Sequence, residues 1–388
     1  MAGRELLQIP GPSNVPRRVL EAIAQPTLDH RGPDFMELAL KVQRNLQRIF
    51  GTGGPVVMYP ASGTGAWEAA LVNTLSPGDR VLFYETGHFA SLWNRLAGRL
   101  GLDPVVVGGD WRRGVAAEPV ARALEEDREH RIRAVCIVHN ETSTGALSNV
   151  SRVRQAITDA GHPALFMVDV ISSLGSVPYA HDDWQVDVTI GASQKGLMLP
   201  PGLSFNALSA KALAAHETAK CVRAYWDWSD MLPGTERGSF PYTPASNLVV
   251  GLSEALTMLL DEEGMAAVFK RHERFASAAR SCVDAWGLEI QCEVKEERSN
   301  VLTAVRLPEG FDADALRGLI RERFDVALGN GLGQIAGKVF RIGHLGDLNE
   351  TMLMGTLSAV EMGLRLSQIP IVKSGVSAAM DRLQIEPS

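Results

Sequence analysis

Short runs of β-branched and other apolar residues alternate with longer amphipathic stretches from about residue 55 to residue 210. This alternation is typical of α/β proteins, in which helices join the strands of a mainly parallel sheet. The candidate strands are Pro55–Tyr59, Arg80–Tyr84, Pro104–Val107, Ile132–Val138, Ala164–Val168, Val186–Ile190 and Leu203–Leu208. The candidate helices are Gly65–Leu75, Phe89–Leu100, Val120–Glu129 and Val150–Ala160. The apolar residues of the central strands are nearly continuous, which predicts a sheet covered on both faces.

The later part of the chain indicates a second domain. Helical patterns cover residues 247–260 and 265–286, and short strands and helices follow them. We therefore expect an N-terminal arm over residues 1–20, a large domain over 21–262 and a smaller C-terminal α+β domain over 263–388. Residues 220–248 are rich in Trp, Tyr, Pro and Gly and are too long for an ordinary connection, so we expect a functional or interface loop there.

Composition excludes several classes of partner. The formal net charge is −7, from 45 acidic and 38 basic residues, and no long run of Lys and Arg is present, which argues against nucleic acid and anionic membranes. Apolar stretches are far shorter than the ~18–20 residues of a membrane span. The N-terminus lacks a secretory pattern, so we expect a cytoplasmic protein. The four cysteines show neither Cys-x-x-Cys spacing nor clustering with His, which predicts no disulfide framework and no metal site.

A Gly-rich turn between a strand and a helix, within residues 56–75, is the first chemical motif. Such a turn presents backbone N–H groups and the positive end of a helix dipole to an anion, most often phosphate. The dinucleotide fingerprint fails at Glu68, no Lys-Ser/Thr pair follows the glycines, and Gly-x-Ser-x-Gly is matched neither at 60–64 nor at 191–195. A phosphate site is favoured, and a turn without a ligand remains the alternative.

Two charged residues complete a possible site. Asp169 follows an apolar strand and so faces the crevice where open α/β sheets bind ligands, unless it only satisfies a turn. Lys195 is the single charged residue between Val188 and Phe205. Desolvation of such a lysine lowers its pKa and frees the amine as a nucleophile or base, unless the side chain reaches solvent at a strand end.

The anion site, the acid and the lysine together fit pyridoxal 5′-phosphate. This cofactor needs a phosphate cradle, a lysine for a Schiff base and an acid for its ring nitrogen. Asp169 and Lys195 are 26 residues apart, which leaves room for a connection and one more strand, so both can face one crevice.

At this point the sequence resembles the class V, fold-type I aminotransferases that use pyridoxal phosphate, and within them the alanine/serine/aspartate-glyoxylate branch. The motifs that carry the resemblance are GPSNVP (11–16), LDHRGPDF (28–35), HNETSTG (139–145), DVISSLG (169–175), SQKGLMLPPG (193–202), FPYTP (240–244) and GKVFRIGHLGD (337–347). The resemblance implies a large domain with a mainly parallel, helix-covered sheet and a smaller C-terminal α+β domain.

The resemblance also implies the cofactor contacts. It assigns the catalytic Schiff base to Lys195 and the ring nitrogen contact to Asp169. The other residues assigned to the cofactor are Thr64, Gly65, Ala66, Phe89, Thr142, Gln194 and Thr243. Phe89 stands where relatives often carry a stacking Trp, and Trp93 is the alternative. Thr243 is expected to reach the phosphate of the partner subunit's cofactor, which implies a homodimer with shared active sites.

Arg341 is the implied clamp for the substrate carboxylate, because guanidinium forms two parallel hydrogen bonds to that group. A plain salt bridge is the alternative. Asn14 and His30 are expected on the substrate side, and Arg31 meets a distal carboxylate if the donor is aspartate; a structural role is the other interpretation of His30 and Arg31. His344 carries the same ambiguity.

We therefore expect transfer of an amino group from a small L-amino acid, with serine as the leading donor, to glyoxylate. Aspartate and alanine are the alternative donors. A lyase or desulfurase on the same fold is a more remote alternative, since a fold does not fix a reaction, and Cys221 is its weak candidate nucleophile. A nicotinamide dehydrogenase or a nucleotide-binding module using residues 62–65 leaves Lys195 unexplained.

Overall fold

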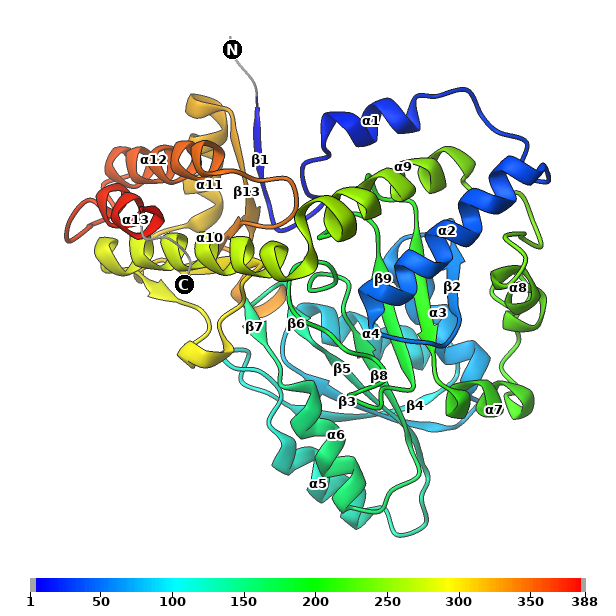
Figure 1. The fold of residues 1–388 in the computed structure, drawn as a ribbon. Helices are drawn as coiled ribbons and strands as arrows, with labels where there is room; N and C mark the ends of the chain where they lie inside the picture. The colour runs from blue at the N-terminus through cyan, green and yellow to red at the C-terminus, as the bar shows by residue number, and fades with distance from the viewer. Residues whose placement is uncertain (1–4, 385–388) are drawn as a thin grey trace.

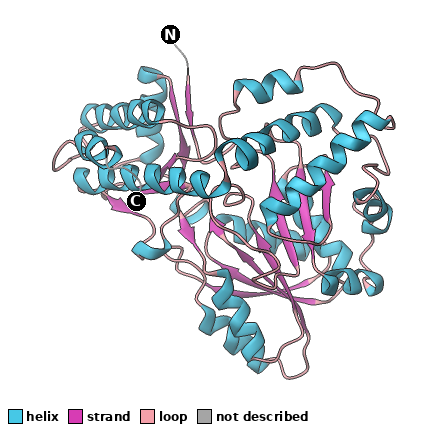
Figure 2. Cartoon of the chain, viewed as in Figure 1, coloured by secondary structure: helices cyan, strands magenta, loops and turns pink. Residues whose placement is uncertain are grey.

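The computed structural model describes residues 5–384 as two sheets with helices packed around them (Figure 1). Residues 1–4, the start of the predicted N-terminal arm, and residues 385–388 lie outside the described part. Coloured by secondary structure, the strands lie inside a shell of helices (Figure 2). No helix among residues 5–384 is both long enough and apolar enough to cross a membrane.

The larger sheet has seven strands in the order β2-β10-β9-β8-β5-β3-β4. Their bounds are β2 Val56–Tyr59, β3 Arg80–Glu85, β4 Asp103–Gly108, β5 Ile132–Val138, β8 Leu165–Asp169, β9 Val188–Ala192 and β10 Ser204–Leu208. All seven predicted strands are present, with ends within two residues of the prediction. Only β10 is antiparallel to its neighbours, so six strands run in one direction and the expected mainly parallel sheet is confirmed.

Helices cover both faces of this sheet (Figure 1). They are α1 Arg17–Ile23, α2 Pro33–Phe50, α3 Gly63–Thr74, α4 His88–Arg99, α5 Ala117–Glu126, α6 Val150–Asp159, α7 Ala210–Thr218, α8 Trp228–Thr235 and α9 Ser246–Thr257, which continues as a π-helical turn over Met258–Glu263. Most of α3 is buried because it packs against β9 and β10 on one side and α4 and α7 on others. The four helices predicted between the strands are confirmed as α3, α4, α5 and α6.

The segment 220–248 was predicted to be a loop, but part of it forms the helix α8. Pro233 inside this helix hides it from a sequence pattern, since proline removes a backbone donor. Tertiary contacts stabilise it nonetheless: Asp227 caps its start by accepting a hydrogen bond from Ser229 N, and Trp228 donates from Nε1 to the Tyr59 hydroxyl at 2.6 Å. Trp228 is fully buried.

The smaller sheet has five strands in the order β1-β13-β14-β12-β11. Their bounds are β1 Leu6–Gln8, β11 Glu289–Ile290, β12 Leu302–Arg306, β13 Val326–Asn330 and β14 Val339–Gly343. The helices α10 Met265–Trp286, α11 Ala313–Phe324, α12 Glu350–Leu366 and α13 Gly375–Leu383 complete a separate apolar core with this sheet. Leu6–Gln8, predicted as part of an N-terminal arm, pairs in parallel with β13 and so joins the C-terminal sheet.

The two sheets meet at the carboxyl ends of the central strands. The register places Val138, the last residue of β5, beside Asp169 at the end of β8, and β9 ends three residues before Lys195. After β1 the chain crosses this edge, where Ser13 N donates to the Gln194 carbonyl and Ser13 Oγ to the Lys195 carbonyl. A crevice between both sheets and the N-terminal segment follows from this arrangement.

Candidate active site

Lys195 lies in a tight turn after β9 and is only 8% exposed. Its Nζ donates a hydrogen bond to the carbonyl oxygen of Pro10, so the amine is held by the N-terminal segment. Burial and, to a smaller extent, the positive charge of Arg341 lower the pKa of Lys195 to about 7. The alternative of a lysine that reaches solvent is therefore wrong, and an appreciable fraction of the amine is neutral near pH 7.

Asp169 ends β8 and is 4% exposed. Its Oδ1 accepts from Ile171 N at 2.7 Å and its Oδ2 from Trp67 Nε1 at 2.8 Å. Burial raises the pKa of Asp169 to about 7, which these two hydrogen bonds only partly oppose. The bond to Ile171 is the turn contact weighed above, but the carboxyl group also lines the cavity that contains Lys195.

The N-terminus of α3 has the features of an anion site. Its N-cap Ser62 makes no side-chain cap, so the first-turn N–H groups have no such partner. A Cβ atom on Gly63 would meet the end of the Ile171 side chain, so this part of the turn packs closely against Ile171. Nearby, the buried Gln194 Oε1 and Asn140 Oδ1 have no hydrogen-bond partner among the described residues. These unpaired acceptors and the helix N-terminus without a side-chain cap fit a polar ligand in this part of the cavity.

The cavity has a volume of about 280 Å³. It is lined by Gly11, Pro12, Ser62, Gly63, Thr64, Trp67, Phe89, Val138, Asn140, Thr142, Asp169, Ile171, Gln194, Lys195 and Pro201. Six residues expected at the cofactor are among them. Gly65 and Ala66 lie in the first turn of α3 but are not part of the lining. Phe89 is in the lining, whereas Trp93, the alternative, is fully buried behind it.

Trp67 is the main lining residue that sequence reasoning missed. It is four positions after Gly63 on α3, a spacing that places both residues on one face of a helix. This spacing alone could have predicted that Trp67 lies on the same side of the helix as the Gly-rich turn. Asn140 is another lining residue without a predicted role, and it lies two positions before Thr142 in the HNETSTG motif.

Arg341 in β14 is 6% exposed and forms no ion pair within residues 5–384, so the salt-bridge alternative is wrong. Its Nη1 donates to the Thr142 carbonyl at 2.8 Å and its Nε to the Asn330 carbonyl at 2.7 Å. Burial lowers the pKa of Arg341 to about 10, which still leaves it charged at neutral pH. A buried cation held by neutral carbonyls, with Nη2 free of described partners, is suited to an anionic ligand.

Glu141, in the short strand β6 (Asn140–Glu141) that pairs with β7 (Ala146–Leu147), is fully buried. Its carboxylate accepts hydrogen bonds from Ser143 N and Oγ and from the backbone N–H groups of Phe89 and Ala90. It therefore caps α4, whose N-cap Gly87 has no side chain. Burial raises the pKa of Glu141, and the hydrogen bonds oppose that shift.

Several predicted residues, Arg341 among them, do not line the cavity. Asn14 donates to the Leu7 carbonyl, His30 lies in the loop before α2 with its Nε2 buried and unpaired, and Thr243 is exposed. Their expected roles stay predictions. His344 bonds to Thr303 Oγ1 and the Asn300 carbonyl inside the smaller domain, contacts that account for it structurally.

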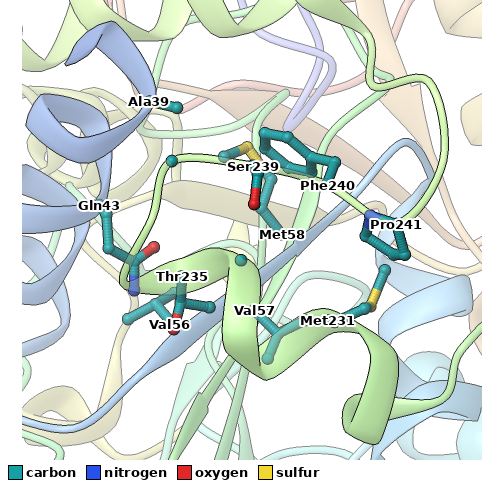
Figure 3. A pocket seen from close by; sticks show the side chains of 12 residues that line it. Ala39, Gln43, Val56, Val57, Met58, Met231, Thr235, Ser239, Phe240 and Pro241 are labelled. Carbon is teal, nitrogen blue, oxygen red and sulfur yellow. The ribbon is translucent and has the colours of Figure 1, made fainter. Parts of the chain in front are cut away.

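A second, smaller cavity lies beside β2, between α2, α8 and the FPYTP segment (Figure 3). It shares no residue with the Lys195 cavity, and its lining of Ala39, Gln43, Val56, Val57, Met58, Met231, Gly234, Thr235, Gly238, Ser239, Phe240 and Pro241 contains no titratable group. Lys195 and Asp169, the two residues that the sequence singled out, both line the other cavity and not this one.

Comparison with known proteins agrees with this geometry. The model of the family described as Aminotransferase class-V matches residues 6–345. The chain belongs to this family. The class-V aminotransferase described here is 46% identical to a serine–glyoxylate aminotransferase of Methylorubrum extorquens, over 99% of this chain and 97% of the relative. It is 43% identical to an L-aspartate–glyoxylate aminotransferase of Paracoccus denitrificans, over 98% and 96%.

A solved structure confirms the fold of this class-V aminotransferase. The ureidoglycine-glyoxylate aminotransferase of Bacillus subtilis superposes with a TM-score of 0.92 at 25% identity, over 99% of both chains. The expected fold-type I architecture is thereby confirmed. The family implies pyridoxal phosphate as cofactor, and the orphaned acceptors, the α3 N-terminus, Asp169 and Lys195 fit that group.

Proposed function

We propose that this aminotransferase transfers the amino group of L-serine to glyoxylate, giving glycine and hydroxypyruvate, with pyridoxal 5′-phosphate as cofactor. The observation that carries the proposal is the pair of Lys195 and Asp169 in one cavity, each buried and each with a pKa near 7. The identity to a serine–glyoxylate aminotransferase supports the choice of donor and acceptor.

The residues around the cavity provide the cofactor contacts. The α3 N-terminus with Thr64, together with Gln194, would hold the phosphate, and Phe89 would cover one face of the ring. When bound, the cofactor supplies a protonated ring that accepts the electron pair released as the substrate's α-proton leaves. Asp169 keeps the ring nitrogen protonated by accepting its hydrogen bond, because a carboxylate beside a cation is favoured.

Lys195 and Arg341 act on the substrate. The lysine Nζ would hold the cofactor, and as a free amine it would take the α-proton of the bound amino acid. The Pro10 carbonyl is the acceptor that orients this free amine. Arg341 orients the α-carboxylate through its guanidinium edge, and the low exposure of both side chains excludes water from the reacting atoms.

The alternative donors remain aspartate and alanine, and the similarity to an aspartate–glyoxylate aminotransferase supports the first. Arg31, considered for a distal carboxylate, is exposed and outside the cavity of its own chain.

The desulfurase alternative has little support, because Cys221 is buried with a raised pKa. Its N–H donates to the Leu75 carbonyl at the far end of α3, roughly 12 Å along the helix from Trp67 in the cavity lining at 1.5 Å per residue.

A homodimer with shared sites is part of the proposal. Thr243 is exposed and away from the cavity of its own chain, as expected if it serves the cofactor of a second copy. The exposed large apolar side chains include Leu20 at 49%, Leu28 at 37% and Val222 at 95%. Sedimentation of the holoenzyme should give a mass of two chains, and T243A should weaken cofactor binding; a monomer with full activity contradicts this part.

The experiment that tests the function separates the donors. Cofactor-loaded enzyme is mixed with serine, aspartate or alanine in the absence of acceptor, and the oxo acid product and the cofactor absorbance are followed. Serine should give hydroxypyruvate fastest, and added glyoxylate should restore the starting spectrum with release of glycine. Faster conversion by aspartate or alanine would replace the donor, and no conversion by any of the three would refute the proposed transamination.

A further inference from the structure

We propose that Trp67 is a positioning residue for this reaction: its indole N–H orients the Asp169 carboxylate toward the ring nitrogen and strengthens its hold on that nitrogen. The inference rests on the proposed function, because it assigns Asp169 to the cofactor ring. It concerns a contact between α3 and β8 that joins residues 102 positions apart in the sequence.

The geometry of Trp67 is fixed by its surroundings. The side chain is 3% exposed, and its Nε1 donates to Asp169 Oδ2 at 2.8 Å. Its ring stacks on that of Trp93, with centroids 5.7 Å apart and planes at 11°, and Trp93 in turn meets the edge of Phe83 at 5.7 Å. Because these rings are buried, the indole cannot turn away from Asp169 without disrupting the stack.

The contact controls how Asp169 presents its oxygens. One oxygen is held by Ile171 N and the other by Trp67 Nε1. An ionised carboxylate has about four acceptor positions, so two remain for the cofactor. Without the indole donor, the group is held on one side only and rotates more freely. The charged form also loses a stabilising hydrogen bond, which favours protonation of Asp169 and weakens the bond to a protonated ring nitrogen.

The neighbouring Trp93 provides a matched control. It belongs to the same stack and is completely buried, but its Nε1 has no hydrogen-bond partner within residues 5–384. W67F and W93F each replace a buried indole by a benzene ring. They remove similar volume from one cluster, but only W67F removes a donor to Asp169.

The test compares both variants as holoenzymes with the wild type. Cofactor affinity is measured by titrating the cofactor into cofactor-free protein, and kcat and KM are measured with serine and glyoxylate. W67F should bind the cofactor about ten-fold or more weakly and show a kcat lowered by a similar factor, since a hydrogen bond to a charged group is of that strength. The KM for serine should change less than about two-fold, and W93F should resemble the wild type.

Each outcome decides between the N–H group and simple packing. Equal losses in W67F and W93F would overturn the proposal, because the stack and not the donor would then matter. An unchanged cofactor affinity and kcat in W67F would overturn it as well. If W67F alone loses cofactor affinity while the wild type transfers no amino group from any donor, the proposed function fails and the role of Trp67 in holding Asp169 stands.

Discussion

Replacing Asp169 by Asn should stabilise the cofactor-free protein at pH 8 while impairing catalysis. Burial raises the pKa of this carboxyl from the ordinary 3.8 to about 7, so the folded state holds its proton more tightly than the unfolded state does. The stability that protonation provides is complete below about pH 4 and is lost as the pH rises through 7. At 1.36 kcal/mol per pKa unit, the ionised carboxylate costs about 4 kcal/mol at pH 8.

Asn removes this cost but introduces a mismatch. Its oxygen can accept from Ile171 N, but its amide N–H groups then face Trp67 Nε1, and an unsatisfied buried donor costs about 1–3 kcal/mol. The net gain at pH 8 is therefore about 1–3 kcal/mol. At pH 5 the cost of burying Asp169 falls to about 2 kcal/mol, because the native carboxyl is then neutral while the unfolded one is still mostly ionised. The mismatch offsets this smaller cost, so the gain disappears. Lys195 attracts the ionised Asp169 only weakly at pH 8, because its pKa is about 7 and most of its amine is neutral there.

Urea unfolding of the cofactor-free wild type and D169N, each at pH 5 and pH 8, measures the difference directly. The variant should have the larger free energy of unfolding at pH 8, and this advantage should disappear at pH 5. Turnover of cofactor-loaded D169N should fall by a factor of 10²–10⁴, in line with the loss of a group that stabilises a proton in the transition state. A variant that is less stable than the wild type at both pH values would refute the reasoning that burial of this carboxylate opposes folding.

Three further substitutions test other contacts. G11A should lower kcat about 100-fold without changing the far-UV circular dichroism spectrum, because Gly11 has a φ of 112° and a Cβ there collides with the Lys195 amine. An unchanged kcat would show that this segment does not position the lysine. E141Q should lower the free energy of unfolding in urea by about 1–3 kcal/mol, since its amide cannot accept from all the N–H groups that Glu141 caps; wild-type stability would contradict the capping role. R341K should raise the KM for both serine and glyoxylate at least about ten-fold, with a smaller effect on kcat, because an ammonium group cannot form two parallel hydrogen bonds. Steady-state kinetics that leave both KM values unchanged would remove Arg341 from the substrate site.

Three features that the structure brings to one cavity were predictable from the sequence. Lys195, Asp169 and the Gly-rich turn before α3 were found because a Schiff base, a ring-nitrogen partner and a phosphate site each demand a particular residue type at a strand end. The strands of the larger sheet were predicted with similar success, since alternation of buried strands and amphipathic helices is a local property of the chain. The helix α8 was missed because a proline contradicts the local pattern and distant contacts outweigh it.

What the sequence by itself determined is therefore the α/β class, the order of the strands along the chain and the reactive groups, all of which depend on residue type and short-range periodicity. Only the tertiary structure decided which other groups surround those residues. The indole of Trp67 reaches Asp169 across 102 residues, and the Pro10 carbonyl reaches Lys195 across 185. Such contacts depend on how α3, β8 and the N-terminal segment pack together, and neither the spacing nor the composition of one segment specifies where another will lie.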